Sequence, residues 1–213
     1  MIFIETENLY LKVPSRDNLV QWTQWINSPF VRETVHSTLL PKTIEIQWEW
    51  VKNELSSEKR IILEICDKVD NSFIGITSLS NINHKARSAQ IAAISPFKKN
   101  KKSQYIIYEA RIAILNYAFK QLSLNKVYAD TVYPNNKSYM IKNMCIGFEI
   151  EGINHDSIWY DNQPKLLINY FLSKLIFDKK KIISSKLDNL LSKKNRNLNE
   201  KKLSKIISYL QVI

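Results

Sequence analysis

The chain has little glycine or cysteine and no long apolar stretch. Three of its 213 residues are glycine and two are cysteine, while 45% are hydrophobic. Cys66 and Cys145 stand in apolar surroundings without disulfide or metal-ligand spacing, which indicates buried free thiols in a reducing compartment. The sequence contains no run of 18 apolar residues, so no membrane span is expected, and its start lacks the pattern of a signal peptide. We therefore expect a cytoplasmic protein with one sizeable core and no metal site.

The net charge of +11 is concentrated towards the carboxyl end. Residues 174–213 hold eleven Lys or Arg and three acids, so they supply +8 of it. Apolar residues recur there at helical spacing, which predicts a basic amphipathic helical extension after a domain of residues 1–173. The extension is either a solvated face, a homodimer contact, or a docking element for an anionic membrane surface or an acidic partner such as a carrier protein. Nucleic acid is disfavoured as a partner, because Tyr209 is the one aromatic residue between Lys179 and Leu210 that could stack on bases.

The order of apolar patterns predicts an α/β fold. Alternating and β-branched runs indicate strands, and apolar stripes at intervals of three and four residues indicate helices. The expected strands cover residues 3–4, 9–13, 60–66, 72–79, 89–94, 126–132, 148–153 and 165–172. The expected helices cover residues 15–27, 43–55, 104–122 and 137–146, with two more in the extension on either side of a polar break at 193–199. Ser15 and Gly147 are expected to cap helices, and Thr43 is expected to start one. Meandering strands followed by alternating helices and strands predict a mixed sheet, with ligands bound beyond the strand ends near residues 91–95 and 128–132.

Short motifs follow one another along the chain in a characteristic order. In the second half they are Asn116–Phe119, Asn136, Gly147–Phe148 and Glu151–Gly152. In the first half they are Asn8–Leu11, Asp17, Trp25–Val31, Ile74–Ile76, Asn81–Asn83 and Arg87–Ala92. Over residues 2–173 the chain resembles the GNAT superfamily of N-acyltransferases, and within it the branch that modifies ribosomal-protein amino termini, polyamines and nucleotide-linked amino sugars. The resemblance implies a mixed, mostly antiparallel central sheet flanked by helices, here with a C-terminal helical extension.

The same resemblance implies an N-acyltransferase. It would move an acyl group, in the first instance acetyl, from acetyl-CoA or another acyl-CoA to a primary amine. The acceptor would be a small molecule, such as a nucleotide-linked amino sugar, or a peptide or protein amine. In this family the first two helices build the acceptor side, and here they carry four tryptophans, which either stack on the acceptor or pack in the core: Trp22, Trp25, Trp48 and Trp50.

The resemblance also places the donor along the strand before the longest expected helix. Backbone groups of Ile91, Ala92, Ala93 and Ile94 would bind the pantetheine arm, and Asn136 would help to hold it. The start of the helix, with its free N–H groups and positive dipole end, would bind the pyrophosphate. The residues concerned are Lys99, Lys101, Lys102, Ser103, Gln104 and Tyr105.

The pyrophosphate loop departs from the family pattern. Tyr105 and Ile107 occupy positions where the family has glycine and a small residue, which let the backbone approach the phosphates. Three interpretations stay open. Lysine charge holds coenzyme A without the glycines, or an acyl carrier protein is the donor and presents phosphopantetheine with a longer acyl chain, or the chain is a non-catalytic GNAT-like binding module.

The reaction needs a neutral amine, a positioned thioester and a stabilised oxyanion. Backbone N–H groups around Ala92 or Ala93 could polarise the thioester carbonyl. Many relatives have Glu near the position of Gln90, which cannot act as a base. The candidate general bases are therefore Glu33, His36 and His155, of which the histidines titrate near neutrality.

A general acid for the leaving thiolate is the other requirement. Some branches place a tyrosine five residues before the phenylalanine of the Gly-Phe motif, where this chain has Asn143. Tyr139 is the candidate substitute if its hydroxyl reaches the sulfur. Its alternative interpretation is a packed residue of an amphipathic helix.

Overall fold

The computed structural model of the protein describes residues 1–34, 40–95, 101–160, 162–180, 182 and 186–210. The chain forms two compact units, Met1–Ala129 and Asp130–Ile213. Within the described ranges, no helix combines the length and the apolar character that crossing a membrane requires.

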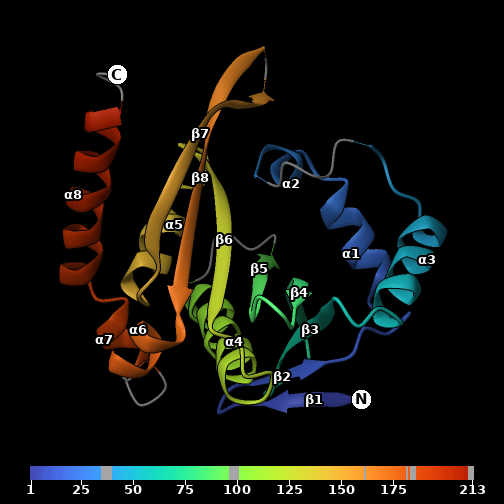
Figure 1. The fold of residues 1–213 in the computed structure, drawn as a ribbon. Coiled ribbons are helices and arrows are strands. Elements are labelled where there is room, and N and C mark those ends of the chain that lie inside the picture. Colours follow the sequence, from blue (N-terminus) through green and yellow to red (C-terminus); the bar gives the residue numbers. More distant parts are fainter. Residues whose placement is uncertain (35–39, 96–100, 161, 181, 183–185, 211–213) are drawn as a thin grey trace. The chain divides into compact units, whose positions relative to one another are not determined.

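The helices and strands follow the predicted order, with the addition of two short helices, α2 and α6, that were not predicted (Figure 1). The first unit contains β1 (Ile2–Glu5), β2 (Leu9–Lys12), α1 (Leu19–Ile26), α2 (Pro29–Thr34), α3 (Ile44–Leu55), β3 (Ile61–Asp67), β4 (Phe73–Asn83), β5 (Ser88–Ile94), α4 (Lys101–Lys120) and the start of β6 (Lys126–Tyr133). The second unit contains the rest of β6, then α5 (Lys137–Cys145), β7 (Glu149–Tyr160), β8 (Gln163–Ser173), α6 (Lys174–Lys179), α7 (Leu187–Leu190) and α8 (Lys193–Leu210).

The strands hydrogen-bond in the order β1-β2-β3-β4-β5-β6-β8-β7. The first four ladders, from β1/β2 to β4/β5, are antiparallel, as is β7/β8, while β5 and β6 pair in parallel. The predicted mixed, mostly antiparallel sheet with flanking helices and a helical C-terminal segment is therefore confirmed.

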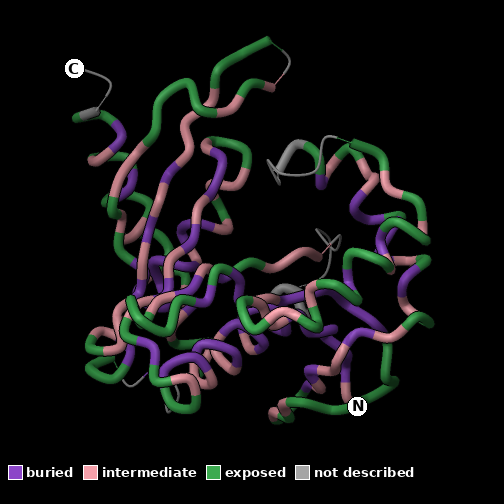
Figure 2. Tube along the Cα trace, turned by 45° about the vertical axis from the view of Figure 1, so that its right-hand side comes forward, coloured by how far each residue is buried: buried purple, intermediate pink, exposed green. Residues whose placement is uncertain are grey.

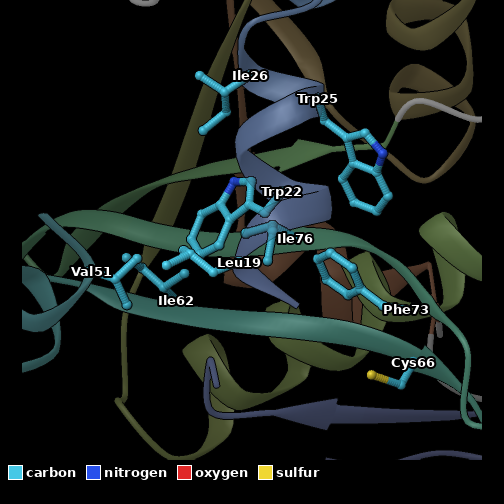
Figure 3. Close-up of a cluster of buried hydrophobic side chains, with 9 residues drawn as sticks. All are labelled: Leu19, Trp22, Trp25, Ile26, Val51, Ile62, Cys66, Phe73 and Ile76. Atoms are coloured by element: carbon cyan, nitrogen blue, oxygen red, sulfur yellow. The ribbon is translucent and has the colours of Figure 1, made fainter. Parts of the chain in front are cut away.

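A hydrophobic core forms where α1 and α3 cover β3 and β4 (Figure 3). Trp25 stacks on Phe73, with ring centroids 4.6 Å apart and an angle of 14° between the planes. Trp22 is 2% exposed and packs edge to face with Trp50, with ring centroids 6.1 Å apart. Aromatic pairs of this kind stabilise a core beyond their buried area. Packing is thus the observed role of Trp22 and Trp25, one of the two alternatives left open by the sequence.

The first helix starts later than its sequence suggests. We expected Ser15 to cap it, but α1 begins at Leu19. The buried carboxylate of Glu64 on β3 accepts hydrogen bonds from the Ser15 N–H at 2.9 Å and from Asn18 Nδ2 at 2.8 Å, so this segment is bound to the sheet instead. The predicted start of α3 at Thr43 is confirmed, and Thr43 caps the helix, since its Oγ1 accepts from the Ile46 N–H at 3.3 Å.

The end of α5 is the predicted glycine cap. Gly147 has φ +110°, a conformation that L side chains rarely adopt. Its N–H donates to Met144 O at 3.1 Å, and the Phe148 N–H donates to Asn143 O at 3.1 Å. These two bonds make a Schellman motif, which satisfies the last carbonyls of the helix and sends the chain into β7.

The last helix is longer than predicted. Residues 193–199 were expected to be a polar break, but they form the first turns of α8. The expectation was wrong because local hydrogen bonds favour the helix: Ser192 Oγ accepts from the Asn195 N–H at 3.3 Å, and Asn199 Nδ2 donates to Asn195 O at 2.9 Å. In the preceding predicted helix, Leu187–Leu190 is helical as α7, while Ile183 lies outside the described residues.

Candidate active site

The C-terminal half of β5 is hydrogen-bonded to β4 along one edge. The antiparallel ladder with β4 continues to the pair Ile76 and Ile94. Among the described residues, the parallel ladder of β5 with β6 covers only Ser88–Gln90, paired with Lys126–Tyr128. The stretch Ile91–Ile94, predicted to bind the donor arm, is thus held by β4 and continues past its ladder with β6.

The direction of each backbone group in this stretch follows from strand alternation. Thr77 Oγ1 donates to Ala92 O at 3.2 Å, and Ile94 O lies 2.7 Å from a Cβ built on Gly75, so both carbonyls face β4. Successive residues of a strand point their N–H and C=O groups to opposite sides. Ala93 therefore turns its N–H and C=O away from β4. These are the groups that an added strand-like ligand would bind.

A close contact fixes the end of β5 onto β4. Gly75 leaves room for Ile94 O, and the Ser95 hydroxyl donates to Ile74 O at 3.1 Å. Sequence reasoning missed both Ser95 and the reason for Gly75. The Ile74–Gly75–Ile76 motif was a signal, because an isolated glycine within a strand often marks a close backbone approach.

The helix start that was predicted to bind the pyrophosphate is the beginning of α4. This helix begins at Lys101, so Lys102, Ser103 and Gln104 belong to its first turn. The backbone N–H groups of a first turn have no hydrogen-bond partner within the helix. Lys99 and the side chains of Lys101–Gln104 lie outside the described residues.

The two residues that replace small family residues are both within α4. Tyr105 is half-buried, and Ile107 is 9% exposed, with its Cδ1 3.3 Å from the Gly75 Cβ position. Ile107 is therefore a packed residue next to the end of β5. A glycine in this helical position would leave a void and cost about 1 kcal/mol in helix propensity.

Asn136 and Tyr139 lie together at the start of α5. Asn136 is the N-cap residue, and its carbonyl accepts from the Met140 N–H at 3.1 Å. Tyr139 lies in the first turn and is half-buried. The helix therefore brings the predicted arm-holding residue and the predicted acid within one turn of each other.

Asn143 is a buried member of a hydrogen-bond chain. Its Nδ2 donates to the Tyr170 hydroxyl at 2.9 Å, and that hydroxyl lies 2.7 Å from Thr131 Oγ1. Because Thr131 Oγ1 donates to Asp130 O at 2.7 Å, the Tyr170 hydroxyl must donate to Thr131. The chain of donors thus runs from Asn143 through Tyr170 and Thr131 to a backbone carbonyl.

Sequence reasoning identified neither Thr131 nor Tyr170. The signal for Tyr170 was its place between Ile168 and Leu172 on the inward face of β8, because a buried tyrosine needs a partner for its hydroxyl. With Tyr170 fully buried, Asn143 is held in the interior by this network.

The three candidate bases are described to different extents. His36 lies outside the described residues, and Glu33 is in α2 with its side chain outside them. His155 is exposed on β7, in the irregular stretch between Asn154 and Ile158, and its carbonyl accepts from Ser157 Oγ at 3.2 Å. Their role as bases stays a prediction.

Helices α1 and α3, predicted to form the acceptor side, carry buried polar atoms. Asn27 fixes the end of α1 to the segment before α3, since its Nδ2 donates to Lys42 O at 2.7 Å and its Oδ1 accepts from the Lys42 N–H at 2.8 Å.

Three other polar atoms of these helices are buried and have no hydrogen-bond partner among the described residues: Trp22 Nε1, Thr23 Oγ1 and Gln47 Nε2. A bound water or ligand would satisfy such atoms.

Neither cysteine is placed for catalysis. Both are free and buried, as predicted, and burial raises the pKa of the Cys66 thiol to about 11 and also raises the pKa of Cys145. Within the part of the chain that the structure describes, no three His, Cys, Asp or Glu residues gather into a group that could hold a metal ion.

Comparison with known proteins agrees with this architecture. The model of the acetyltransferase (GNAT) domain family matches residues 11–165. A Bacillus subtilis (strain 168) protein, "Putative ribosomal N-acetyltransferase YdaF", is 26% identical over 164 residues, which are 77% of this chain and 82% of that protein.

Solved structures share the fold at lower identity. Spermidine N-acetyltransferase from Vibrio cholerae, in complex with CoA and spermine, superposes with a TM-score of 0.71 at 18% identity, covering 81% of this chain and 99% of that one. RimL, a ribosomal L7/L12 α-N-protein acetyltransferase in complex with CoA, gives 0.69 at 12% identity, covering 81% and 98%. The relatives found thus include proteins named for ribosomal-protein and polyamine acetylation, two of the activities of the predicted branch. With the family model matching well over half of its length, the chain belongs to the GNAT acetyltransferase family.

Proposed function

We propose that the protein transfers an acetyl group from acetyl-CoA to the primary amine of a polyamine or of a protein. The observation that carries this proposal is the C-terminal half of β5, where Ala93 turns its backbone groups away from β4 beyond the ladder with β6. Family membership supplies the reaction class, and the relatives named for ribosomal proteins and spermidine supply the two classes of acceptor.

In the proposed reaction the pantetheine arm pairs with β5 like an added strand. The neutral amine attacks the thioester carbonyl, and the Ala93 N–H stabilises the developing oxyanion. When the tetrahedral intermediate collapses, the C–S bond breaks and coenzyme A leaves as a thiolate. The attacking nitrogen gives its proton to a base or to water, and the thiolate takes a proton from an acid, for which we propose Tyr139.

Helix α4 supports the other end of the donor. The N–H groups of its first turn and the lysine charges around them favour a pyrophosphate. The absence of glycine here supports a second donor, an acyl carrier protein, whose phosphopantetheine would need β5 but no pyrophosphate site. The packed side chain of Ile107, at a position where the family has a small residue, is the specific observation in favour of it.

The experiment is a turnover assay that measures thiol release and product mass. Acetyl-CoA is supplied with spermidine, with a peptide bearing a free amino terminus, or with no acceptor, and the assay is repeated with an acyl carrier protein loaded with a long acyl chain. Acetylated amine formed from acetyl-CoA supports the first donor. Product from the loaded carrier alone would replace it with the second, and no product from either would refute an acyltransferase.

A matched pair of variants tests the β5 assignment. Ala93→Pro removes the N–H that faces away from β4, whereas Ala93→Gly keeps it. We expect the proline variant to weaken acetyl-CoA binding by about tenfold, which corresponds to one hydrogen bond of about 1.4 kcal/mol, and to lower kcat further. Equal binding by the two variants would show that this N–H does not contact the donor. Tyr139→Phe, assayed in parallel, should lower kcat with little change in binding.

A further inference from the structure

One side of α8 is a continuous basic surface within the second unit. Its residues, which we call the outer face of α8, lie three, four or seven positions apart and so share one side of the helix: Lys194, Leu198, Lys201, Lys202, Lys205 and Tyr209. All six are exposed. From Lys194 to Tyr209 this face extends for about 22 Å, at 1.5 Å per residue.

The opposite side of α8 is fixed to α5 (Figure 1). Leu203 and Ile207 are buried there, and buried and exposed stretches alternate along the helix in Figure 2. Lys137 Nζ pairs with Glu200 Oε1 at 2.7 Å, and Asn199 Nδ2 contacts Cys145 Sγ at 3.6 Å. Because the helix cannot turn without breaking these contacts, the outer face is presented away from α5.

The outer face combines charge with apolar side chains. Glu200, the one acidic residue of α8, lies on another side and is paired with Lys137, so no carboxylate of this helix neutralises the lysines. Leu198 and Tyr209 are each 66% exposed and stand three helical turns apart among the lysines. Apolar anchors surrounded by charges of one sign are typical of a surface that steers and then holds an oppositely charged partner.

We propose that the outer face of α8 docks an acidic helix of a partner protein. Carboxylates of that helix pair with the lysines, and its apolar residues contact Leu198 and Tyr209. A bilayer fits less well, because the continuous apolar side of α8 is already packed on α5 and only two separated apolar side chains remain outside. RNA fits less well because Tyr209 alone offers a stacking surface.

The experiment measures binding of a labelled peptide to the full chain by fluorescence anisotropy. The probe is a helical peptide about 22 Å long, rich in glutamate, with two leucines three turns apart, and the control peptide has glutamine for every glutamate. Oligouridine and vesicles containing phosphatidylserine are the competing ligands. The test variant carries Lys194→Glu, Lys201→Glu and Lys205→Glu. The matched control carries Lys52→Glu, Lys59→Glu and Lys85→Glu. These substitutions replace three exposed lysines of the first unit and lower the net charge by the same amount.

We expect the acidic peptide to bind the native chain and the control variant about equally, and the test variant about tenfold more weakly. Leu198→Ser with Tyr209→Ser, which leaves the charge unchanged, should weaken binding about fivefold. Equal losses in the two lysine variants would mean general charge attraction and overturn the proposal. Three other results would also overturn it. These are equal affinity of the native chain for the glutamate and glutamine peptides, unchanged affinity of the Leu198→Ser, Tyr209→Ser variant for the acidic peptide, and tighter binding of oligouridine or vesicles through the same lysines.

Discussion

Gly75→Ala should distort the end of β5, which we propose binds the donor. The added methyl group would lie 2.7 Å from Ile94 O, 3.2 Å from Ser95 Cβ and 3.3 Å from Ile107 Cδ1. The first of these is a backbone atom held in a ladder, so it cannot turn aside as a flexible side chain would. Overpacking of this kind costs about 1–3 kcal/mol. At roughly 2–4 °C per kcal/mol for a chain of this size, the melting temperature should fall by roughly 2–12 °C.

Gly152→Ala is the matched control on another strand of the sheet. A Cβ built on Gly152 meets no atom within 4 Å. The same chemical change should therefore shift stability by less than about 0.5 kcal/mol, or raise it slightly by restricting the unfolded chain.

Thermal unfolding of both variants, with and without acetyl-CoA, checks the argument. We expect only Gly75→Ala to have a lower melting temperature than the native chain. We also expect acetyl-CoA to raise the melting temperature of this variant much less than that of the native chain. If the two glycine variants melt at the same temperature, the close approach of Ile94 to β4 does not constrain β5. If Gly75→Ala is destabilised but keeps the full acetyl-CoA shift, the end of β5 does not carry the donor site.

Three further predictions concern buried polar groups. Tyr170→Phe breaks the chain of donors from Asn143, so urea unfolding should show a loss of about 1–3 kcal/mol, whereas Tyr209→Phe on the surface should show almost none. Burial raises the pKa of Glu64 above 4.5, so its share of stability is complete below pH 4.5 and is lost as pH rises through the raised pKa; the native chain should lose stability relative to Glu64→Gln over that window, and parallel pH profiles would contradict this. With a pKa of about 11, Cys66 is about 0.1% thiolate at pH 8, so mass spectrometry should find it alkylated by iodoacetamide only after unfolding, and rapid labelling of the native chain would show otherwise.

Much of the fold was predictable because local signals agreed with tertiary packing. Thr43 and Gly147 cap their helices as their residue types indicate, and the apolar stripe of α1 does face the core. Where prediction failed, a distant residue or a local polar bond decided the outcome. Ser15 does not cap α1, because its N–H donates to the carboxylate of Glu64. Glu64 is 49 positions away in the chain, so no local pattern could connect the two residues.

The candidate site was predictable only as far as strand and helix positions go. The sequence alone shows that Ala93 turns its backbone groups to the side opposite to those of Ala92 and Ile94. Which of the two sides faces β4 follows only from the contacts of Ala92 O with Thr77 and of Ile94 O with Gly75. The chain from Asn143 through Tyr170 to Thr131 joins α5, β8 and β6, so no spacing in the sequence could have shown it.

The contact between α8 and α5 has a consequence for how the chain can be divided. The family match ends at residue 165, which suggests that the basic tail could be trimmed away. Trimming would uncover the side of α5 that Leu203 and Ile207 now help to cover, and would remove the partner of Lys137, the residue that follows Asn136. An anchored helix of this kind acts as a splint for the start of α5. A shortened chain should therefore aggregate and be poorly ordered around Tyr139. A loss of turnover in that chain would then reflect a disturbed α5 rather than a missing partner.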